Sequence, residues 1–228
     1  MKLKELSFLA FTSLLILNSC EENKPYHPEK HSGKHQHANH HMNKTPFEDL
    51  VKRFESPDRD EWQKPESVIA FLGDLRNKTV VDIGAGTGYL EFKIKDTTAK
   101  LIAADVDERF IKYIDERLAS NSVKHISTRK AVYDKPPVQA NEADIVFMID
   151  VYHHIENREV YFSEVKKGLK AGGKLIIVDF KKGDFKQGPP DAMKLNASQV
   201  IEEMKSAGFK LVEKDSETLP YQYMLKFE

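Results

Sequence analysis

Apolar residues along this chain fall into two kinds of pattern, short continuous runs and runs spaced every three or four residues. Five continuous runs predict buried strands, at residues 79–83, 100–105, 123–127, 143–149 and 174–180. Helical spacing lies between them, most clearly over residues 107–119 and 159–169. Strands that alternate with helices are typical of an α/β protein with a parallel, doubly wound sheet.

The C-terminal part departs from this alternation. A helix capped by Ser198 runs to Ala207, and two further strands follow at residues 209–213 and 221–227 with no helix between them. Neighbouring strands with such a short connection pair antiparallel or lie apart.

Two helices are expected before the first strand, over residues 47–54 and 65–72. Pro65 suits the first turn of the second helix. We therefore expect one domain over residues 47–228, with residues 47–76 as an N-terminal helical cap. Trp62, the only tryptophan, lies in that cap and is a candidate contact for the substrate or simply a core residue.

A glycine-rich loop directly follows the strand at 79–83. It reads Asp82-Ile83-Gly84-Ala85-Gly86-Thr87-Gly88, and Tyr89 follows. Glycines let the backbone turn sharply and let a ligand lie against bare main chain. Asp105 ends the next strand, about 20 residues on, where nucleotide-binding folds place a carboxylate for ribose hydroxyls.

The loop suits either a dinucleotide or S-adenosylmethionine, and a glycine turn that binds no ligand is the third interpretation. A dinucleotide site would have a third glycine where Tyr89 stands, and a tyrosine there would crowd a pyrophosphate. An acidic residue at 82 also fits poorly beside phosphate but suits an ammonium group. The pattern favours S-adenosylmethionine over a nicotinamide or flavin cofactor.

Asp82-x-Gly84-x-Gly86-x-Gly88 resembles the first motif of class I S-adenosylmethionine-dependent methyltransferases. The resemblance implies a Rossmann-like, doubly wound sheet of seven strands, mostly parallel with one reversed C-terminal strand. It also implies a set of residues that bind the cofactor: Asp82, Gly84, Ala85, Gly86, Gly88, Asp105, Val106 and Asp150.

The segment after the fourth strand carries the candidate chemistry. It reads Asp150-Val151-Tyr152-His153-His154 and, with the strand that follows, resembles small-molecule methyltransferases. Asp150 would accept a hydrogen bond from an acceptor hydroxyl or from the ammonium of the cofactor, and His153 or His154 would act as base. Adjacent side chains leaving a strand diverge, so we expect at most one histidine to face the site. Tyr152 is a candidate contact for the substrate.

Residues 54–228 also resemble a group of uncharacterised bacterial methyltransferases. The shared motifs are Arg-Asp-x-Trp-Gln-x-Pro from Arg59, Tyr-His-His-Ile from Tyr152, Gly-Pro-Pro from Gly188 and Leu-Pro-x-Gln-Tyr from Leu219. The resemblance implies transfer of a methyl group to a small molecule and leaves the acceptor open.

The N-terminus predicts export. A basic start, an apolar run from Leu6 to Leu17 and the sequence Leu17-Asn18-Ser19-Cys20 describe a secretory signal that resembles a bacterial lipobox. The resemblance implies a signal peptide over residues 1–19, lipidation of Cys20 and a membrane-anchored protein on the periplasmic face or cell surface. Because S-adenosylmethionine is made in the cytoplasm, a non-catalytic, lipid-anchored binding protein is the alternative function.

Residues 20–46 are polar and predict a disordered tether. The tether holds six of the nine histidines, which permit loose binding of divalent metal without a defined site. We expect no metal site in the domain, which has no cysteine. The net charge of −1 gives no basic face for nucleic acid.

Overall fold

The computed structural model describes residues 39, 42–97 and 100–228. The predicted signal peptide at 1–19, Cys20 and the six tether histidines lie outside the described residues. The lipid anchor and metal binding by the tether therefore stay predictions from the sequence. No helix in the described ranges has the length and apolar character needed to cross a membrane.

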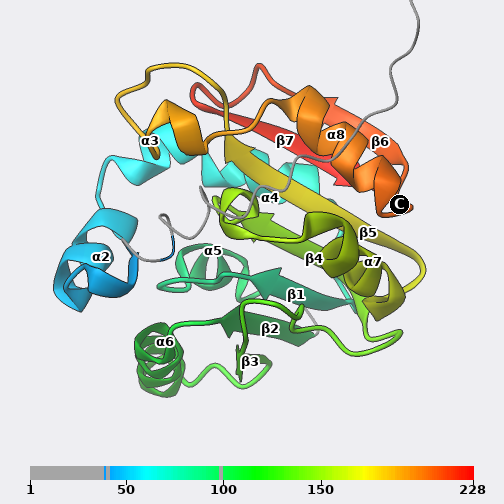
Figure 1. The fold of residues 1–228 in the computed structure, drawn as a ribbon. Helices are drawn as coiled ribbons and strands as arrows, with labels where there is room; N and C mark the ends of the chain where they lie inside the picture. Colours follow the sequence, from blue (N-terminus) through cyan, green and yellow to red (C-terminus); the bar gives the residue numbers. More distant parts are fainter. Residues whose placement is uncertain (1–38, 40–41, 98–99) are drawn as a thin grey trace, which may run out of the picture. The chain divides into compact units, whose positions relative to one another are not determined.

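Seven strands form a single sheet in the described part of the chain (Figure 1). The strands are β1 (Thr79–Ile83), β2 (Lys100–Asp105), β3 (Ile126–Lys130), β4 (Ala143–Ile149), β5 (Leu169–Phe180), β6 (Leu211–Asp215) and β7 (Gln222–Phe227). Their order across the sheet is β3-β2-β1-β4-β5-β7-β6. The order reverses direction between β1 and β4, and ligands of doubly wound sheets bind at such a switch point.

The reversed strand is β7. It pairs antiparallel with β5, from Leu175 opposite Phe227 to Phe180 opposite Gln222, whereas the pairs β1–β2, β1–β4, β2–β3 and β4–β5 are all parallel. β6 pairs antiparallel with β7 at the sheet edge. The predicted seven-stranded sheet with one reversed C-terminal strand is confirmed.

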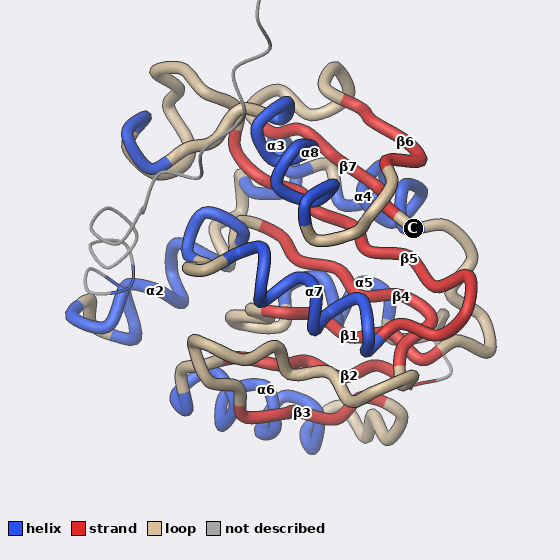
Figure 2. Tube along the Cα trace, turned by 45° about the vertical axis from the view of Figure 1, so that its right-hand side comes forward, coloured by secondary structure: helices blue, strands red, loops and turns tan. Residues whose placement is uncertain are grey.

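Helices cover both faces of the sheet (Figures 1 and 2). The longer helices are α2 (Phe47–Phe54), α4 (Pro65–Leu72), α6 (Glu108–Ser120), α7 (Arg158–Gly168) and α8 (Ala197–Ser206). The shorter ones are α3 (Arg59–Gln63), α5 (Tyr89–Ile94) and the 3₁₀ turns η1 (Tyr152–His154) and η2 (Asp191–Met193). Figure 2 shows α6 beside β2 and β3, and α7 on the opposite face.

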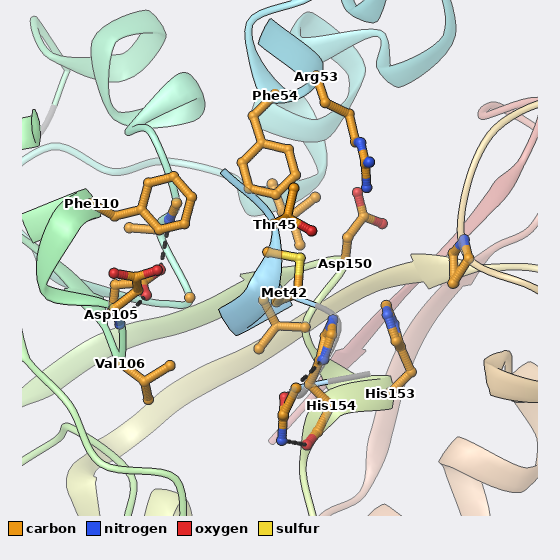
Figure 3. Close-up of a pocket in the computed structure, with 18 of the residues that line it drawn as sticks. Met42, Thr45, Arg53, Phe54, Asp105, Val106, Phe110, Asp150, His153 and His154 are labelled. Atoms are coloured by element: carbon orange, nitrogen blue, oxygen red, sulfur yellow. Dashed lines mark hydrogen bonds between the residues drawn. The ribbon is translucent and has the colours of Figure 1, made fainter. Parts of the chain in front are cut away.

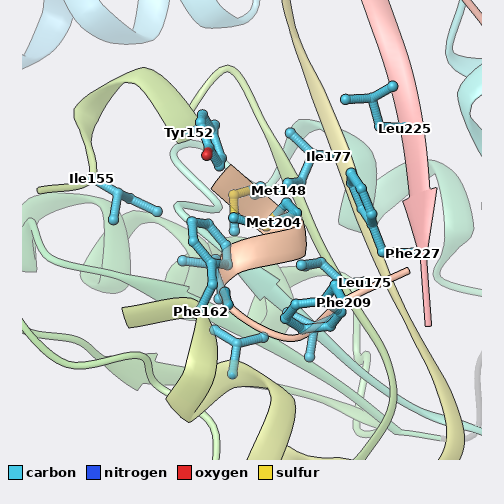
Figure 4. Packing of buried hydrophobic residues seen from close by; sticks show 14 of the residues in the cluster. Met148, Tyr152, Ile155, Phe162, Leu175, Ile177, Met204, Phe209, Leu225 and Phe227 are labelled. Carbon is cyan, nitrogen blue, oxygen red and sulfur yellow. The ribbon is translucent and has the colours of Figure 1, made fainter. Parts of the chain in front are cut away.

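Two hydrophobic clusters, one on each face, hold the helices to the sheet. On one face Phe162 of α7 and Met204 of α8 pack against β4, β5 and β7 (Figure 4). On the other face α4, α5 and α6 pack against β1 and β2. Burial of one large apolar side chain contributes about 1.5–3 kcal/mol, so these clusters fix the sheet that carries the loops described below.

The third strand is displaced from its prediction, from 123–127 to Ile126–Lys130. Val123 closes the end of α6 instead, because its backbone N–H donates to the Leu118 carbonyl at 3.0 Å. Ser122 just before it has a φ of 55°, the left-handed conformation that ends many helices. The apolar Val123 therefore marks a helix end and was misread as the start of a strand.

The fifth strand is longer than the predicted 174–180 and includes Gly172 and Gly173. β5 begins earlier, at Leu169, and its register against β4 shifts between Ala143 and Ile145. The glycines therefore form an irregularity within a long strand.

Candidate functional site

A cavity of about 1330 Å³ opens at the carboxyl ends of β1, β2 and β4. The loops after these three strands line one side, and the N-terminal segment with α2 and α3 lines the other. Sites for a single small ligand are commonly about 300–1,000 Å³. The cavity therefore has room for a nucleoside cofactor and a second small molecule together.

The glycine loop forms the floor of the cavity. Gly84, Gly86 and Gly88 all have positive φ, of 83°, 56° and 77°. A Cβ at Gly84 would lie 2.3 Å from a methyl group of Val151, so the loop after β1 and the loop after β4 touch at this point. The backbone N–H groups of Gly84 and Ala85 both donate to the Ala104 carbonyl, which ties the loop to β2.

Asp105 lies at the same edge, at the end of β2. One carboxylate oxygen accepts from the Gly86 backbone N–H at 2.9 Å and the other from the Asp107 backbone N–H at 2.8 Å. The side chain lines the cavity with 7% of its surface exposed, and burial raises its pKa to about 6. Each oxygen retains a second lone pair, so the carboxylate can accept from two neighbouring hydroxyls.

The loop also contains a buried polar atom without a partner. Thr87 lines the cavity, but its hydroxyl oxygen is buried, and no hydrogen bond to it occurs among the described residues. The cavity surface here is therefore backbone, and Asp105 with the bare glycine backbone fits a nucleoside with an amino-acid tail.

Asp82 lies beneath the loop and outside the cavity lining. It is a buried neighbour of Glu91, and burial, together with that second carboxyl group, raises the pKa of Asp82 well above its usual range. Two adjacent buried carboxyl groups favour a shared proton. The predicted contact of Asp82 with the cofactor ammonium stays a prediction.

Asp150 follows β4 and faces the cavity (Figure 3). Its φ is 61°, an uncommon conformation for a residue with a Cβ. Burial and the charge of Asp179 together raise the pKa of Asp150 to about 7, although Arg59, Gln222 and His153 act to lower it. Backbone strain of this kind is frequent at functional sites, and the structure brings Asp150 to the place that the sequence predicts.

Three side chains from two distant parts of the sequence form a series of hydrogen bonds that ends at Asp150. The Arg59 Nε–H donates to the Gln63 amide oxygen at 3.1 Å, and the Gln63 amide N–H donates to the Gln222 amide oxygen at 2.8 Å. The Gln222 amide N–H then donates to Asp150 at 2.5 Å. We call this sequence of hydrogen bonds the glutamine chain. It joins α3, β7 and the end of β4.

His153 forms a buried pair with Asp179 of β5. The two groups lie 2.9 Å apart, from Nδ1 to Oδ1, and both are almost fully buried. Burial lowers the pKa of His153, but the charge and hydrogen bond of Asp179 outweigh burial and raise it overall. For Asp179 burial raises the pKa, and the imidazole with two backbone N–H groups lowers it overall. This arrangement directs Nδ1 at the Asp179 carboxylate, and His153 also lines the cavity.

His154 also lines the cavity, so the expectation that at most one histidine faces the site is wrong. Its Nδ1 lies 3.0 Å from the Asn39 amide oxygen, and its ring centroid is 4.3 Å from that of His153 (Figure 3). The two residues belong to η1, whose three residues per turn separate neighbouring side chains less than a strand does.

Trp62 forms part of an aromatic wall on the β5 side of the cavity. Its ring centroid lies 6.0 Å from Phe180 and 6.3 Å from Tyr221. Gly188 covers Phe180, since a Cβ at Gly188 would lie 2.5 Å from that ring. Trp62 and the loop around Gly188 therefore meet at Phe180. Trp62 lines the cavity, and its contact with substrate stays a prediction.

Tyr152 does not line the cavity. Its side chain is fully buried in the core, where it stacks on Phe162 and its hydroxyl donates to Glu203 at 2.5 Å (Figure 4). Glu203 also accepts from Arg158, so this network fixes η1 to α7 and α8. The predicted contact of Tyr152 with substrate is therefore corrected, because the first residue of η1 points into the protein.

The N-terminal segment completes the cavity. Met42, Thr45 and Phe54 line it, and Phe54 stacks on Phe110 with centroids 5.6 Å apart (Figure 3). Residues 42–46, which the sequence places in the tether, therefore lie against the site. Val106, another predicted contact of the cofactor, forms the apolar wall beside Asp105.

Sequence reasoning missed Arg59, Asp179, Gln63 and Gln222. Each is brought to the site by the sheet order or by the cap, so no local spacing identifies it. Arg59, Gln63 and Gln222 lie in short motifs shared with other bacterial proteins, whereas Asp179 lies in none of these motifs. Within the described residues no group of three or more histidine, cysteine or acidic side chains could hold a metal ion.

Comparisons with known proteins show that the chain is similar to methyltransferases. Residues 81–177 match the family described as "Methyltransferase domain". A tRNA U34 carboxymethyltransferase of Shewanella frigidimarina is 26% identical over 122 residues, 52% of this chain and 36% of that protein. Phosphoethanolamine N-methyltransferase 2 of Caenorhabditis elegans is 31% identical over 121 residues, 51% of this chain and 27% of that protein. The chain thus spans about a third of the length of these two relatives.

A solved structure extends the match over most of the fold. The S-adenosylmethionine-dependent methyltransferase of Aquifex aeolicus has a TM-score of 0.74 and 25% identity, and the match covers 81% of this chain and 98% of that one. The loops that line the floor of the cavity fall within the matched family region.

Proposed function

We propose that the protein is an S-adenosylmethionine-dependent methyltransferase that transfers a methyl group to a small molecule, on the match of residues 81–177 to the methyltransferase family and on the fold shared with the Aquifex aeolicus methyltransferase. The observation that carries the proposal is the cavity itself. The glycine loop and Asp105 form one end of it, and a buried His153–Asp179 pair lies at the other. A binding protein without catalysis would have no need of a base positioned in this way.

The residues that would hold the cofactor follow from the contacts described above. Asp105 would accept from the ribose hydroxyls, Val106 would pack on the base, and the loop from Gly84 to Gly88 would admit the amino-acid part. Asp150 would accept from the ammonium group, and Arg59 carries the positive charge that suits the carboxylate. When bound, S-adenosylmethionine supplies an electrophilic methyl group on a sulfonium.

The chain itself would orient the acceptor, exclude water and take up its proton. The cap and the loop around Gly188 both line the cavity, which favours alignment of the acceptor with the methyl group. The His153 imidazole, which lines the cavity, would accept the proton of an acceptor hydroxyl or amine, and Asp179 would stabilise the imidazolium that forms.

A small acceptor is favoured over a nucleic acid. Trp62 and Phe180 give an aromatic wall inside the cavity, and basic and acidic residues are nearly balanced over the chain. The named acceptors of the two relatives, a tRNA and phosphoethanolamine, differ, so the class of acceptor rests on the cavity.

The first test is binding of S-adenosylhomocysteine to the purified full-length chain by isothermal titration calorimetry. We expect saturable binding with one molecule per chain. The second test supplies methyl-labelled S-adenosylmethionine with a panel of small hydroxyl- and amine-bearing compounds, and compares wild type with His153→Gln. Absence of binding at millimolar ligand contradicts the proposal. Binding without transfer to any compound by wild type favours the binding-protein alternative.

We also propose that Cys20 carries a lipid anchor, on the lipobox-like sequence that precedes it. Labelling of cells with radioactive palmitate should label the wild type and leave Cys20→Ala unlabelled. A wild-type protein that remains unlabelled in the cytoplasmic fraction contradicts the anchor.

A further inference from the structure

The glutamine chain has a fixed direction. Arg59 can only donate and an ionised Asp150 can only accept, so each amide between them has one orientation that satisfies both neighbours. Gln63 and Gln222 have no exposed surface, and the contact between them joins residues 159 apart in sequence. Each amide therefore accepts a hydrogen bond from the neighbour on the Arg59 side and donates one to the neighbour on the Asp150 side.

Asp150 needs such support because of its surroundings. Asp179 on β5 is a second buried carboxylate whose charge opposes ionisation of Asp150. Arg59 on α3 and His153 on η1 act in the other direction, and Gln222 on β7 gives the one hydrogen bond described to the Asp150 carboxylate. An ionised carboxylate in a buried position is unfavourable unless such groups stabilise it.

Fold stability alone does not account for this arrangement. Buried polar pairs can often be replaced by apolar residues of similar volume with little loss of stability. Here the bonds end on a residue in a left-handed conformation that lines the cavity. Backbone strain and buried polar contacts occur together at Asp150. This combination indicates that the hydrogen bonds maintain the position and the charge of its carboxylate.

We propose that Gln63 and Gln222 are positioning residues that hold the Asp150 carboxylate ionised and directed at the cavity, where it binds the ammonium of the cofactor. The inference rests on the proposed function, because it assigns a task to Asp150 within the cofactor site. Gln222 acts directly on Asp150. Gln63 acts through Gln222, and it also connects the site to the cap through Arg59.

The test measures affinity for S-adenosylhomocysteine between pH 5 and pH 9 in the full-length chain. Gln222→Met keeps the volume of the side chain and removes its amide. We expect affinity about ten-fold weaker at neutral pH, which is the usual effect of losing one hydrogen bond to a charged group. The step in the pH profile that Asp150→Asn abolishes should move to higher pH in Gln222→Met, because the carboxylate loses its donor.

The matched control is Gln199→Met. Gln199 also donates from its amide to a buried carboxylate, that of Glu203 at 3.0 Å, but it does not line the cavity. The affinity of Gln199→Met for S-adenosylhomocysteine should equal that of the wild type at every pH. Circular dichroism and thermal unfolding check that each variant is folded.

A second measurement isolates the role of Gln63 and serves if Gln222→Met does not fold. Gln63→Met leaves the Gln222–Asp150 bond in place and should weaken binding by a smaller factor, about three-fold. Combined with Gln222→Met, it should not move the pH step of Asp150 any further, since Gln63 reaches Asp150 only through Gln222. Additive effects would overturn that order of action.

The outcomes separate the two proposals. If the wild type does not bind S-adenosylhomocysteine, the proposed function fails. If the wild type binds and the pH profiles of Gln222→Met and Gln63→Met equal its own, the function stands and the positioning role is overturned.

Discussion

The two ends of the cavity are built by different means. The cofactor end consists mainly of backbone, with three glycines of positive φ and an Asp105 carboxylate held by two backbone N–H groups. The other end, called the acceptor end because it holds His153, consists of side chains from α3, η1, β5 and β7 that bond to one another, and its Asp150 would also contact the ammonium of the cofactor. The backbone-built end tolerates few changes of shape, whereas the side-chain-built end depends on the charge and protonation of its members.

The largest loss of stability is expected for a change at Glu203, which supports the acceptor end from the core without lining the cavity. Glu203→Met removes the carboxylate that accepts from Tyr152 and from the buried Arg158. Leaving one partner of a buried ion pair unpaired typically costs about 3–5 kcal/mol, so the free energy of unfolding should fall by that amount in urea denaturation. A loss below 1 kcal/mol would show that η1 does not depend on this network.

At the cofactor end the matched comparison is between two glycines. Gly84→Ala combines a φ of 83° with a Cβ 2.3 Å from Val151, whereas Gly172→Ala has a φ of 76° and no atom within 4 Å. We expect a loss of stability of about 3 kcal/mol for Gly84→Ala and about 1 kcal/mol for Gly172→Ala. Urea denaturation of both variants gives the difference, and equal losses would mean that the contact of the two loops is easily relieved.

Asp105→Asn keeps the size of the side chain and removes its charge. Affinity for S-adenosylhomocysteine should fall about ten-fold or more, because charge-assisted hydrogen bonds to the ribose become neutral ones. In the wild type the pKa of Asp105 is raised to about 6, so affinity should rise as pH increases through 6. Calorimetric titrations from pH 5 to pH 7.5 should show this rise in the wild type and not in the variant.

The smallest expected effect concerns the His153–Asp179 pair and stability against pH. The pKa of His153 is raised in the folded protein, so its stabilising contribution is present below 6.5, the ordinary value, and is lost as pH rises through the folded pKa. The pKa of Asp179 is lowered, so its contribution is lost only as pH falls below about 3.8.

Thermal unfolding of Asp179→Asn tests this linkage. The variant should be less stable than the wild type, by an amount on the order of 1 kcal/mol, between pH 4.5 and pH 6.5. The difference should shrink at higher pH as the wild-type imidazole loses its proton. A difference that is constant with pH would indicate that His153 stays neutral beside Asp179.

The difference between the two ends of the cavity also explains which site residues can be predicted from the sequence. Gly84 to Gly88 and Asp105 lie within 22 residues on consecutive elements, and their spacing alone identifies the cofactor end. Asp150 and His153 were predictable because the residue after the fourth strand of a doubly wound sheet faces the same crevice. Strand β3 was misplaced because the apolar residue that ends α6 looked like part of the strand.

The remainder of the acceptor end could not be predicted from local pattern. Asp179 lies within an apolar run and reads as part of a strand, and only the parallel pairing of β4 with β5 brings it to His153. Gln63 and Gln222 read as ordinary polar residues near a helix end and a strand start. Their meeting depends on the cap lying over the reversed strand, which is a tertiary relation.

The position of β7 within the sheet has a consequence for folding. β6 is made before β7, yet β7 lies between it and the rest of the sheet. A growing chain therefore cannot dock β6 until its last strand has been inserted, and Gln222 is the first residue of that strand. Until then the cavity lacks the amide that contacts Asp150, so the nascent protein would acquire its full affinity for ligand only after synthesis has passed residue 222.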